Sequence, residues 1–228
     1  MNLAIIPARG GSKRIPKKNI KLFHGKPIIA YSIEAALSSN CFDEVIVSTD
    51  CEEIADIAKK FGAQVPFVRP AAFSDDYATT TDVIKHAIKW YENNNLMINN
   101  ICCIYATAPF VSSTDISAGL ETLINGNYDY AFSVTSYEFP IQRALKIDDN
   151  GQSSMFYPEH LNTRSQDLIE SFHDAGQFYW GTSEAFSLEK PIFTSNSFGI
   201  KLPPTQVQDI DTYEDWERAE IMYRLLGK

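Results

Sequence analysis

The sequence has few cysteines, and it shows neither the pattern of a secretory leader nor a membrane-spanning run. Its 228 residues include four cysteines, Cys41, Cys51, Cys102 and Cys103, which show neither C-x-x-C metal spacing nor a disulfide framework. Buried thiols are the simplest interpretation. The N-terminus lacks the basic and then apolar order of a signal peptide, and no apolar run reaches the thickness of a bilayer. We therefore expect a cytoplasmic protein that does not enter a membrane.

Positive charge is also scarce. The chain has 20 lysines and arginines against 29 aspartates and glutamates, a formal net charge of -9 and a pI near 4.9. Binding to a nucleic-acid backbone needs a broad basic face, so this composition argues against a nucleic-acid partner. With 44% hydrophobic and 21% charged residues the chain is typical of soluble globular proteins, and its length suits one domain over residues 1–228.

The first half of the chain alternates short β-rich runs with helical patterns. We predict strands over 2–7, 44–49, 64–68 and 101–106, and helices over 27–39, 51–61, 80–93 and 113–124. Strands that alternate with helices form parallel sheets with crossover helices. The sequence therefore predicts an α/β fold, in which a Rossmann-like, mainly parallel sheet is flanked by helices.

The pattern becomes less regular after a strand predicted over 131–135. Residues 138–180 are rich in aromatic side chains and are interrupted by glycine and proline. We interpret them as a small β-rich insertion that packs against a second subunit or covers a ligand, and a surface meander is the alternative. Residues 212–226 predict a closing helix, with Thr212 able to cap its start.

One loop reverses the overall charge. Six cations lie within thirteen residues after the first strand, and no acidic residue precedes Glu34. They are Arg9, Lys13, Arg14, Lys17, Lys18 and Lys21. In an α/β sheet ligands bind beyond the carboxyl ends of the strands, where this loop begins. Gly10 and Gly11 permit positive φ and close backbone approach, so that N–H groups can converge on an anion, and Ser12 adds a hydroxyl donor.

This loop matches neither of the two common phosphate motifs. It lacks the Gly-Lys-Ser/Thr ending of a P-loop and the third glycine of a dinucleotide fingerprint. A basic surface loop, in which the glycines only make a turn, is the alternative. Its position after the first strand and its density of cations favour a phosphate-binding loop.

The same residues resemble a known family. The run from 8 to 19, Ala-Arg-Gly-Gly-Ser-Lys-Arg-Ile-Pro-Lys-Lys-Asn, is similar to the N-terminal signature of the CMP-sialic acid synthetase family, the cytidylyltransferases that activate nonulosonic acids. The resemblance spans nearly the whole chain in order. It continues through Val47-Ser48-Thr49-Asp50, Arg69-Pro70, Thr107-Ala108-Pro109 and Gln208-Asp209-Ile210-Asp211-Thr212.

Three segments are most similar to the members of this family that act on pseudaminic acid. They are residues 105–110, 139–145 and 173–181. The sialic acid enzymes usually have Gln-Pro-Thr-Ser-Pro where this chain has residues 105–109, and they tend to have lysine where Gln142 stands. Both positions face the sugar in that family, so the differences argue against N-acetylneuraminate as the substrate.

The resemblance implies a fold of the nucleotide-diphospho-sugar transferase type and the transfer of CMP from CTP to a nonulosonic acid, with release of diphosphate. The sugar 2-hydroxyl would attack the α-phosphorus, which requires a bound triphosphate and a stabilised leaving group. The implied catalytic residues are Arg9, Lys18 and Asp211. The implied nucleotide-binding residues are Ala8, Arg9, Gly10, Gly11, Ser12, Lys18, Asn19, Arg69 and Thr107.

Asp209 and Asp211 are the implied metal ligands. Two carboxylates at i and i+2 lie on one face of an extended segment and suit Mg²⁺, which usually takes one or two carboxylates together with substrate phosphates. In the family the matching pair binds the metal. From spacing alone, Asp211 before Thr212 would instead be part of a helix cap.

A second set of residues is predicted to bind the sugar acid. It consists of Tyr105, Gln142, Arg143, Arg164, Gln177, Tyr179 and Phe193. Arg164 is the first candidate for the sugar carboxylate and Arg143 the second, because a guanidinium binds a carboxylate bidentately. His173 beside Asp174 is interpreted as a recognition or structural residue rather than a general base, because neighbours in an extended chain point in different directions.

The main hypothesis is therefore a CTP-dependent enzyme that acts on pseudaminic acid, uses Mg²⁺ and forms a homodimer. N-acetylneuraminate, legionaminate or the related eight-carbon acid are alternative substrates. A non-catalytic nucleotide-sugar binding module is the alternative from another class. Loss of Arg9, Lys18, Asp209 or Asp211 would have favoured that module, and all four residues are present.

Overall fold

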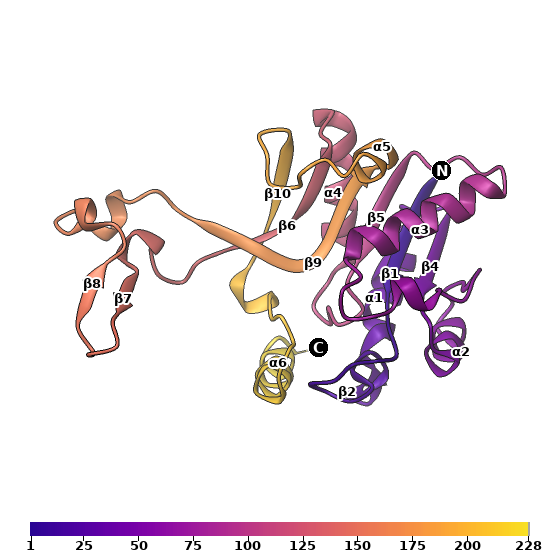
Figure 1. Cartoon of the computed structure of the whole chain (residues 1–228), viewed down its shortest axis with the longest axis horizontal. Coiled ribbons are helices and arrows are strands. Elements are labelled where there is room, and N and C mark those ends of the chain that lie inside the picture. The colour runs from indigo at the N-terminus through magenta and orange to yellow at the C-terminus, as the bar shows by residue number, and fades with distance from the viewer. Residues whose placement is uncertain (228) are drawn as a thin grey trace.

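The computed structural model describes residues 1–227, and a six-stranded sheet forms its centre (Figure 1). The strands are β1 Asn2–Pro7, β4 Glu44–Ser48, β5 Asn100–Ile104, β6 Tyr130–Ser136, β9 Phe172–Thr182 and β10 Ser197–Leu202. Their order in the sheet is β10-β6-β9-β5-β1-β4. β1 runs parallel to β4 and β5, β10 runs parallel to β6, and β9 is antiparallel to both of its neighbours. The prediction of a mainly parallel sheet is confirmed.

Helices cover both faces of this sheet (Figure 1). They are α1 Ile28–Ser39, α2 Glu52–Lys60, α3 Thr80–Asn93, α4 Ser113–Gly126, α5 Ser183–Ser187 and α6 Tyr213–Leu225. All five helices predicted from the sequence are present, and their ends differ from the prediction by at most two residues. Within residues 1–227, none of the helices has both the length and the apolar character needed to cross a bilayer.

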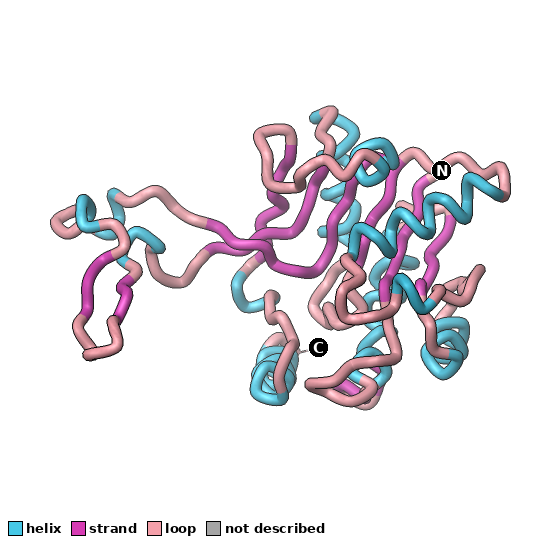
Figure 2. Tube along the Cα trace, in the orientation of Figure 1, coloured by secondary structure: helices cyan, strands magenta, loops and turns pink. Residues whose placement is uncertain are grey.

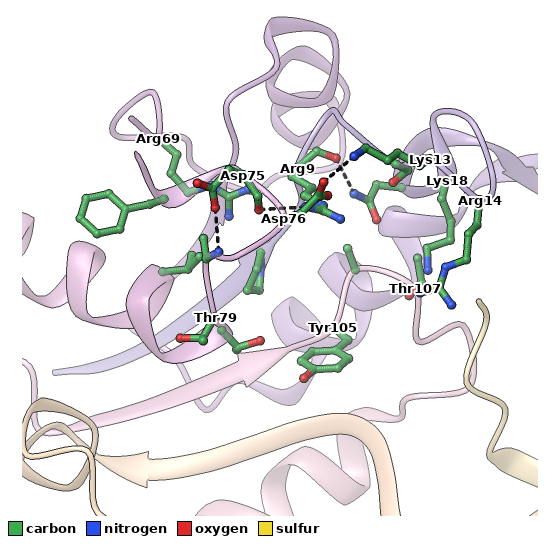
Figure 3. A pocket seen from close by; sticks show the side chains of 18 of the residues that line it. Arg9, Lys13, Arg14, Lys18, Arg69, Asp75, Asp76, Thr79, Tyr105 and Thr107 are labelled. Carbon is green, nitrogen blue, oxygen red and sulfur yellow. Dashed lines mark hydrogen bonds and ion pairs between the residues drawn. The ribbon is translucent and has the colours of Figure 1, made fainter. Parts of the chain in front are cut away.

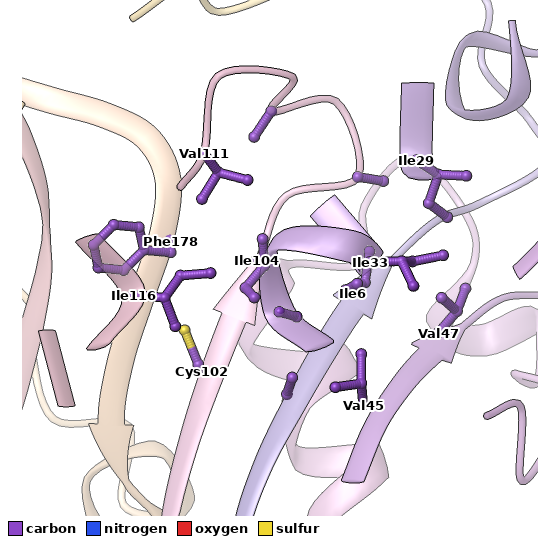
Figure 4. Close-up of a cluster of buried hydrophobic side chains, with 14 of the residues drawn as sticks. Ile6, Ile29, Ile33, Val45, Val47, Cys102, Ile104, Val111, Ile116 and Phe178 are labelled. Atoms are coloured by element: carbon purple, nitrogen blue, oxygen red, sulfur yellow. The ribbon is translucent and has the colours of Figure 1, made fainter. Parts of the chain in front are cut away.

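The sheet is buried on both sides. One apolar core lies between the sheet and α1, α2 and α4, and it contains Ile6, Ile33 and Phe178 (Figure 4). A second core lies between the opposite face and α3 and α5, and it contains Ile5 and Ile88. Neighbouring residues of β1 thus enter different cores, as expected for a parallel strand that is covered on both faces.

A third apolar cluster lies beyond the carboxyl ends of the strands. Here α6 packs on α1 and on a short hairpin made of β2 Leu22–Phe23 and β3 Lys26–Pro27. The rings of Phe23 and Trp216 lie 5.6 Å apart, and Ile210, just before α6, is fully buried. The last segment of the chain is thereby held beside the loop that follows β1.

The prediction of a strand over 64–68 is wrong. Only two isolated bridges form there, between Gln64 and Ile46 and between Val68 and Thr49. Pro66 lies between the bridges and has no N–H group to donate to a ladder. The segment therefore follows β4 without becoming a full strand of the sheet.

The insertion predicted over 138–180 ends earlier than expected. Its last part belongs to β9, which lies in the middle of the sheet between β5 and β6. Phe178 and Trp180 enter the first core and Tyr179 enters the second, so these aromatic side chains are buried instead of exposed. A strand that is buried on both faces lacks the alternation of apolar and polar residues, and its pattern was therefore misinterpreted.

Residues 137–171, called the extension from here on, leave the sheet between β6 and β9 and project away from the body (Figure 2). The extension contains an antiparallel hairpin of β7 Leu145–Ile147 and β8 Ser153–Met155. Several of its large apolar side chains are exposed: Phe139, Leu145, Ile147, Phe156, Leu161 and Ile169. Exposed apolar residues gathered on one segment are typical of a surface that packs against another molecule.

Substitution of Trp180 on β9 tests whether this side chain is buried in the first core. Its indole N–H donates to the carbonyl oxygen of Ile116 at 2.8 Å, and its ring stacks on Phe42. We expect Trp180→Ala to lower the free energy of unfolding by about 3–5 kcal/mol, because the truncation leaves a cavity. Urea unfolding measures the loss. Phe198→Ala, at a half-exposed position of β10, is the control and should cost less than about 1 kcal/mol. Equal losses would contradict the assignment.

Candidate functional site

A pocket of about 440 Å³ opens at the carboxyl ends of β1 and β5 (Figure 3). Four parts of the chain line it: the loop after β1, residues 69–83, the end of β5 with Thr107, and Asp211 from the C-terminal segment. This is the edge of an α/β sheet at which ligands bind.

The lining of the pocket is rich in positive charge. Five cations, Arg9, Lys13, Arg14, Lys18 and Arg69, line it together with three carboxylates, Asp75, Asp76 and Asp211. The rest of the chain is strongly acidic, since the net charge is -9. A local excess of cations on an acidic protein concentrates small anions at this point.

Arg69 is the most deeply placed of these cations, with only 4% of its surface exposed. Its Nε donates to Ser74 Oγ at 3.1 Å, and the nearest carboxylate oxygen, Oδ1 of Asp50, lies 4.0 Å from Nη2. Burial, opposed by Asp50, lowers the pKa of Arg69. A buried guanidinium that has no closely paired carboxylate is stabilised by an incoming anion. Arg69 was predicted as a nucleotide-binding residue, and it lines the pocket.

The loop after β1 is held by hydrogen bonds that its backbone N–H and C=O groups make. The N–H of Gly10 donates to Asp50 Oδ1 at 2.8 Å, the N–H of Ser12 donates to the Gly10 carbonyl at 3.0 Å, and Asn19 Nδ2 donates to the Arg9 carbonyl at 3.0 Å. Below the loop, Ala8 is buried and its N–H donates to Ser48. The Gly10 amide is thus directed at Asp50 and not at the pocket.

The two glycines differ in what they provide. Neither of them has a positive φ, so the loop does not use this freedom of glycine. A Cβ on Gly10 would lie 3.0 Å from the Cβ of Cys51, so glycine permits a close approach of the loop to α2. A Cβ on Gly11 would meet nothing within 4 Å. Asp50 was not predicted as a site residue, although it ends the motif Val47-Ser48-Thr49-Asp50, which begins in the last residues of β4.

Asp76 binds the same cations that a phosphate would need. Its Oδ1 lies 2.9 Å from Arg9 Nη1, and its other oxygen accepts from Lys13. The carbonyl of Asp75 also accepts from Arg9, at 2.9 Å. Hydrogen bonding to Lys13, with a smaller contribution from Arg9, lowers the pKa of Asp76. This contact was not predicted from the sequence, because the two segments are far apart along the chain.

The C-terminal segment reaches the pocket through Lys18. Its Nζ donates to the carbonyl of Ile210 at 2.5 Å and lies 3.5 Å from Asp211 Oδ1, and Nη2 of Arg14 lies 2.9 Å from that same oxygen. Of the two predicted metal ligands, Asp211 lines the pocket and Asp209 does not. Desolvation by the surrounding chain, followed by repulsion from Asp211, raises the pKa of Asp209.

The predicted sugar-binding residues do not all lie together. Tyr105 lines the pocket, and its ring lies 5.5 Å from that of Tyr179. Gln177 is buried, and its Nε2 donates to the Gln206 carbonyl at 2.5 Å. Phe193 is 70% exposed and packs on the ring of Phe132, away from the pocket lining.

The remaining three predicted sugar-binding residues belong to the extension. Gln142 Nε2 donates to the Ile169 carbonyl at 3.0 Å, Arg143 donates to the Thr163 carbonyl, and Arg164 pairs with Asp167 at 2.7 Å. None of the three lines the pocket of its own chain. His173 also lies outside this pocket, with its ring on Tyr137 at 4.8 Å and its Nδ1 2.8 Å from the Asp174 carbonyl.

Comparison with known proteins identifies the family. The profile of the family described as Cytidylyltransferase matches residues 3–224. The chain is 49% identical to a pseudaminic acid cytidylyltransferase of Campylobacter jejuni, over 98% of this chain and 97% of that protein. It is 32% identical to a CMP-N,N'-diacetyllegionaminic acid synthase of Legionella pneumophila, over 98% and 96% of the two chains. The protein therefore belongs to the cytidylyltransferase family.

A solved structure supports the fold. The structure of a CMP:2-keto-3-deoxy-manno-octonic acid synthetase complexed with CTP covers 98% of each chain, with a TM-score of 0.71 and 16% identity. The similarity at this level of identity concerns the arrangement of helices and strands. It agrees with the predicted nucleotidyltransferase type of α/β fold.

Asp50 provides a test of how the loop is held. In Asp50→Ala the N–H of Gly10 loses its acceptor, so we expect faster hydrogen exchange at Gly10 and its neighbours in the loop. Asp50→Asn keeps an oxygen that can accept from Gly10 and should protect the loop better than the alanine variant. Exchange followed by mass spectrometry measures both, and Asp43→Ala, which removes the acceptor of the Asn2 N–H, is the control. Unchanged exchange at Gly10 would contradict the role of Asp50.

Proposed function

We propose that this protein transfers CMP from CTP to the 2-hydroxyl of pseudaminic acid and releases diphosphate. The observation that supports this most strongly is a pocket lined by five cations in a chain that is 49% identical to a pseudaminic acid cytidylyltransferase. Identity to the legionaminic acid synthase is only 32% over a similar length, so pseudaminic acid is the favoured substrate. We also propose a cytoplasmic location.

The cations of the pocket would together neutralise the negative charge of a bound triphosphate. Arg9 and Lys13 lie on the loop after β1, and Arg69 lines the same pocket from the segment between α2 and α3 (Figure 3). Lys18, whose side chain is 20% exposed, lies nearest the C-terminal segment and would stabilise the charge that develops on the departing diphosphate. Ser12 and Thr107 would donate hydroxyl hydrogen bonds to the bound nucleotide.

Asp209 and Asp211 fit a magnesium ion by their chemistry. Mg²⁺ takes oxygen ligands and is often held by one or two carboxylates together with substrate phosphates. Within residues 1–227 no group of three or more acidic, histidine or cysteine side chains could hold a metal. Asp211 would exchange its contacts with Arg14 and Lys18 for the ion. When bound, the ion would neutralise phosphate charge and lower the pKa of the attacking hydroxyl.

The alternatives are a synthetase for N-acetylneuraminate, legionaminate or the eight-carbon acid, and a nucleotide-sugar binding module without activity. The module is disfavoured because Arg9, Lys18 and Asp211 all lie on one pocket. A module would bind a nucleotide and release no diphosphate.

Diphosphate release from CTP and Mg²⁺ tests the function. We expect the fastest release with pseudaminic acid in a panel of the candidate sugar acids. Asp211→Ala should slow it by on the order of 10²-fold or more, because a charged group that acts on the transition state is removed. Circular dichroism should show an unchanged fold. Faster turnover of another sugar would replace pseudaminic acid, and full activity of Asp211→Ala would remove Asp211 from the mechanism.

Asp76 competes with the triphosphate for Arg9 and Lys13. We expect Asp76→Asn to lower the KM for CTP about two- to five-fold, the range of an exposed ion pair, because the competing negative charge is gone. Steady-state kinetics with CTP measures the change. Glu53→Gln is the matched control, since Glu53 pairs with Lys17 on the same loop and neither residue lines the pocket. A raised KM in Asp76→Asn would contradict competition.

We further propose a homodimer in which the extension packs against a second copy. This arrangement would cover the exposed apolar side chains of the extension. It would also bring Gln142, Arg143 and Arg164 to the pocket of the other copy, where the sugar carboxylate would meet a guanidinium.

Light scattering tests the dimer. The chain has a mass of 25.7 kDa, so we expect twice that mass for the wild type. Ile147→Glu, at a position that is 71% exposed in the extension, should shift the mass towards the monomer, because a charge would be buried in the interface. Leu188→Glu, 64% exposed outside the extension, should not. A monomeric wild type would refute the proposal.

A further inference from the structure

Arg14 lines the pocket beside Lys18, and both cations contact the same carboxylate oxygen (Figure 3). Nη2 of Arg14 lies 2.9 Å from Oδ1 of Asp211, and Nζ of Lys18 lies 3.5 Å from it. Two positive charges therefore lie at the carboxylate that was predicted to bind a metal. In this state Asp211 is a poor ligand for a free divalent cation, because both neighbours repel the incoming ion.

The two cations are held in different ways. Lys18 also donates to the Ile210 carbonyl at 2.5 Å, and its side chain is 20% exposed. Lys18 therefore has an anchor that does not depend on Asp211. The Arg14 side chain is 66% exposed, and within residues 1–227 its one hydrogen-bonding partner is Asp211. Ion pairs that are this exposed are weak, so Arg14 is the cation that can change its partner at small cost.

The backbone fixes the position of Asp211. Its N–H donates to Asp215 Oδ2 at 3.1 Å, within the capping box that starts α6, and Ile210 just before it is fully buried. The carboxylate is thus held at the pocket by the packing of α6. What can change is the cation that it contacts.

A bound triphosphate alters the balance of charge in the pocket. Five cations line it against three carboxylates, and an excess of positive charge disfavours the entry of a further cation. A guanidinium binds phosphate oxygens through two parallel N–H···O bonds, and a triphosphate offers it more negative charge than one carboxylate does. The nucleotide therefore favours the release of Asp211 by Arg14.

We propose that Arg14 changes its partner from Asp211 to the phosphates when a nucleoside triphosphate binds. Asp211 then accepts a divalent cation together with the nucleotide and excludes the free ion from the empty site. This inference rests on the proposed function in one respect, since it takes the pocket as the site of CTP and of the ion.

Binding of Mn²⁺, which shares the oxygen ligands of Mg²⁺ and is detected by electron paramagnetic resonance, tests the inference. We expect weak binding to the free wild type and tighter binding to its complex with CTP, with protein in excess so that nearly all of the nucleotide is bound. Free Arg14→Gln should bind Mn²⁺ about three- to five-fold more tightly than the free wild type, the size of an exposed ion pair. The CTP complex should change by less than about twofold, because Arg14 no longer contacts Asp211 there.

Calorimetry of CTP binding gives an independent measurement. The factor by which Mn²⁺ tightens the binding of CTP equals the factor by which CTP tightens the binding of Mn²⁺. We therefore expect this factor to be about three- to five-fold smaller in Arg14→Gln than in the wild type.

Lys17→Gln is the matched control. Lys17 lies on the same loop, its side chain is also 66% exposed, and it pairs with Glu53, which does not line the pocket. This variant removes the same charge without touching Asp211, so the affinity for Mn²⁺ should stay within about twofold of the wild type. Arg14→Lys keeps the charge and should stay closer to the wild type than Arg14→Gln does.

The outcomes distinguish this inference from the proposed function. The inference is overturned by an unchanged affinity of free Arg14→Gln for Mn²⁺, by an equal gain with and without CTP, by an equal gain in Lys17→Gln, or by a wild type that binds Mn²⁺ equally well without CTP. Diphosphate release by the wild type, and with it the proposed function, is unaffected by these results. The binding measurements need no sugar acid, so a wild type that binds CTP and releases no diphosphate contradicts the proposed function alone. A wild type that does not bind CTP overturns both.

Discussion

The gathering of positive charge at the carboxyl ends of β1 and β5 is the constraint on which the rest of the site depends. Like charges repel, and the side chain of Arg69 is almost completely buried there. The structure holds these cations with carboxylates from different parts of the chain, Asp50 after β4, Asp76 before α3 and Asp211 before α6. The positive charge is balanced well enough to fold and remains available to an anion with several charges.

Both ends of the chain are needed to form this site. Lys18 follows the first strand, and the carbonyl that it binds belongs to Ile210, which is buried in the cluster under α6. Packing of α6 on the hairpin and on α1 therefore sets the position of Asp211. Without α6, nothing would hold this carboxylate at the pocket.

β9 joins the pocket to the extension. It returns from the extension into the middle of the sheet, pairs with β5 and β6, and carries Asp174 and Tyr179 on the way. Tyr105 follows β5, its neighbour. The antiparallel strand thus connects the part of the pocket lined by Tyr105 with the segment whose apolar side chains are exposed. A partner that packs on the extension would lie along the same strand.

The sequence by itself determined the class of fold, five of the helices and the location of the cationic loop. These features depend on short-range signals: apolar periodicity, the cap at Thr212, and a run of cations after a buried strand. β9 and residues 64–68 were predicted wrongly. A strand that is buried on both faces has the same pattern as any other apolar run. Pro66 interrupts the ladder of hydrogen bonds without changing the apolar pattern of its segment.

Only the tertiary structure decided how the site is assembled. The contacts of Gly10 with Asp50, of Arg9 with Asp76 and of Tyr179 with Asp174 depend on where distant or bulged segments meet in space. It also decided that Arg69 is buried and that Arg164 lies away from the pocket of its own chain. Such contacts cannot be predicted from residue types and spacing, because the contacts arise from the packing of whole helices and strands around shared cores.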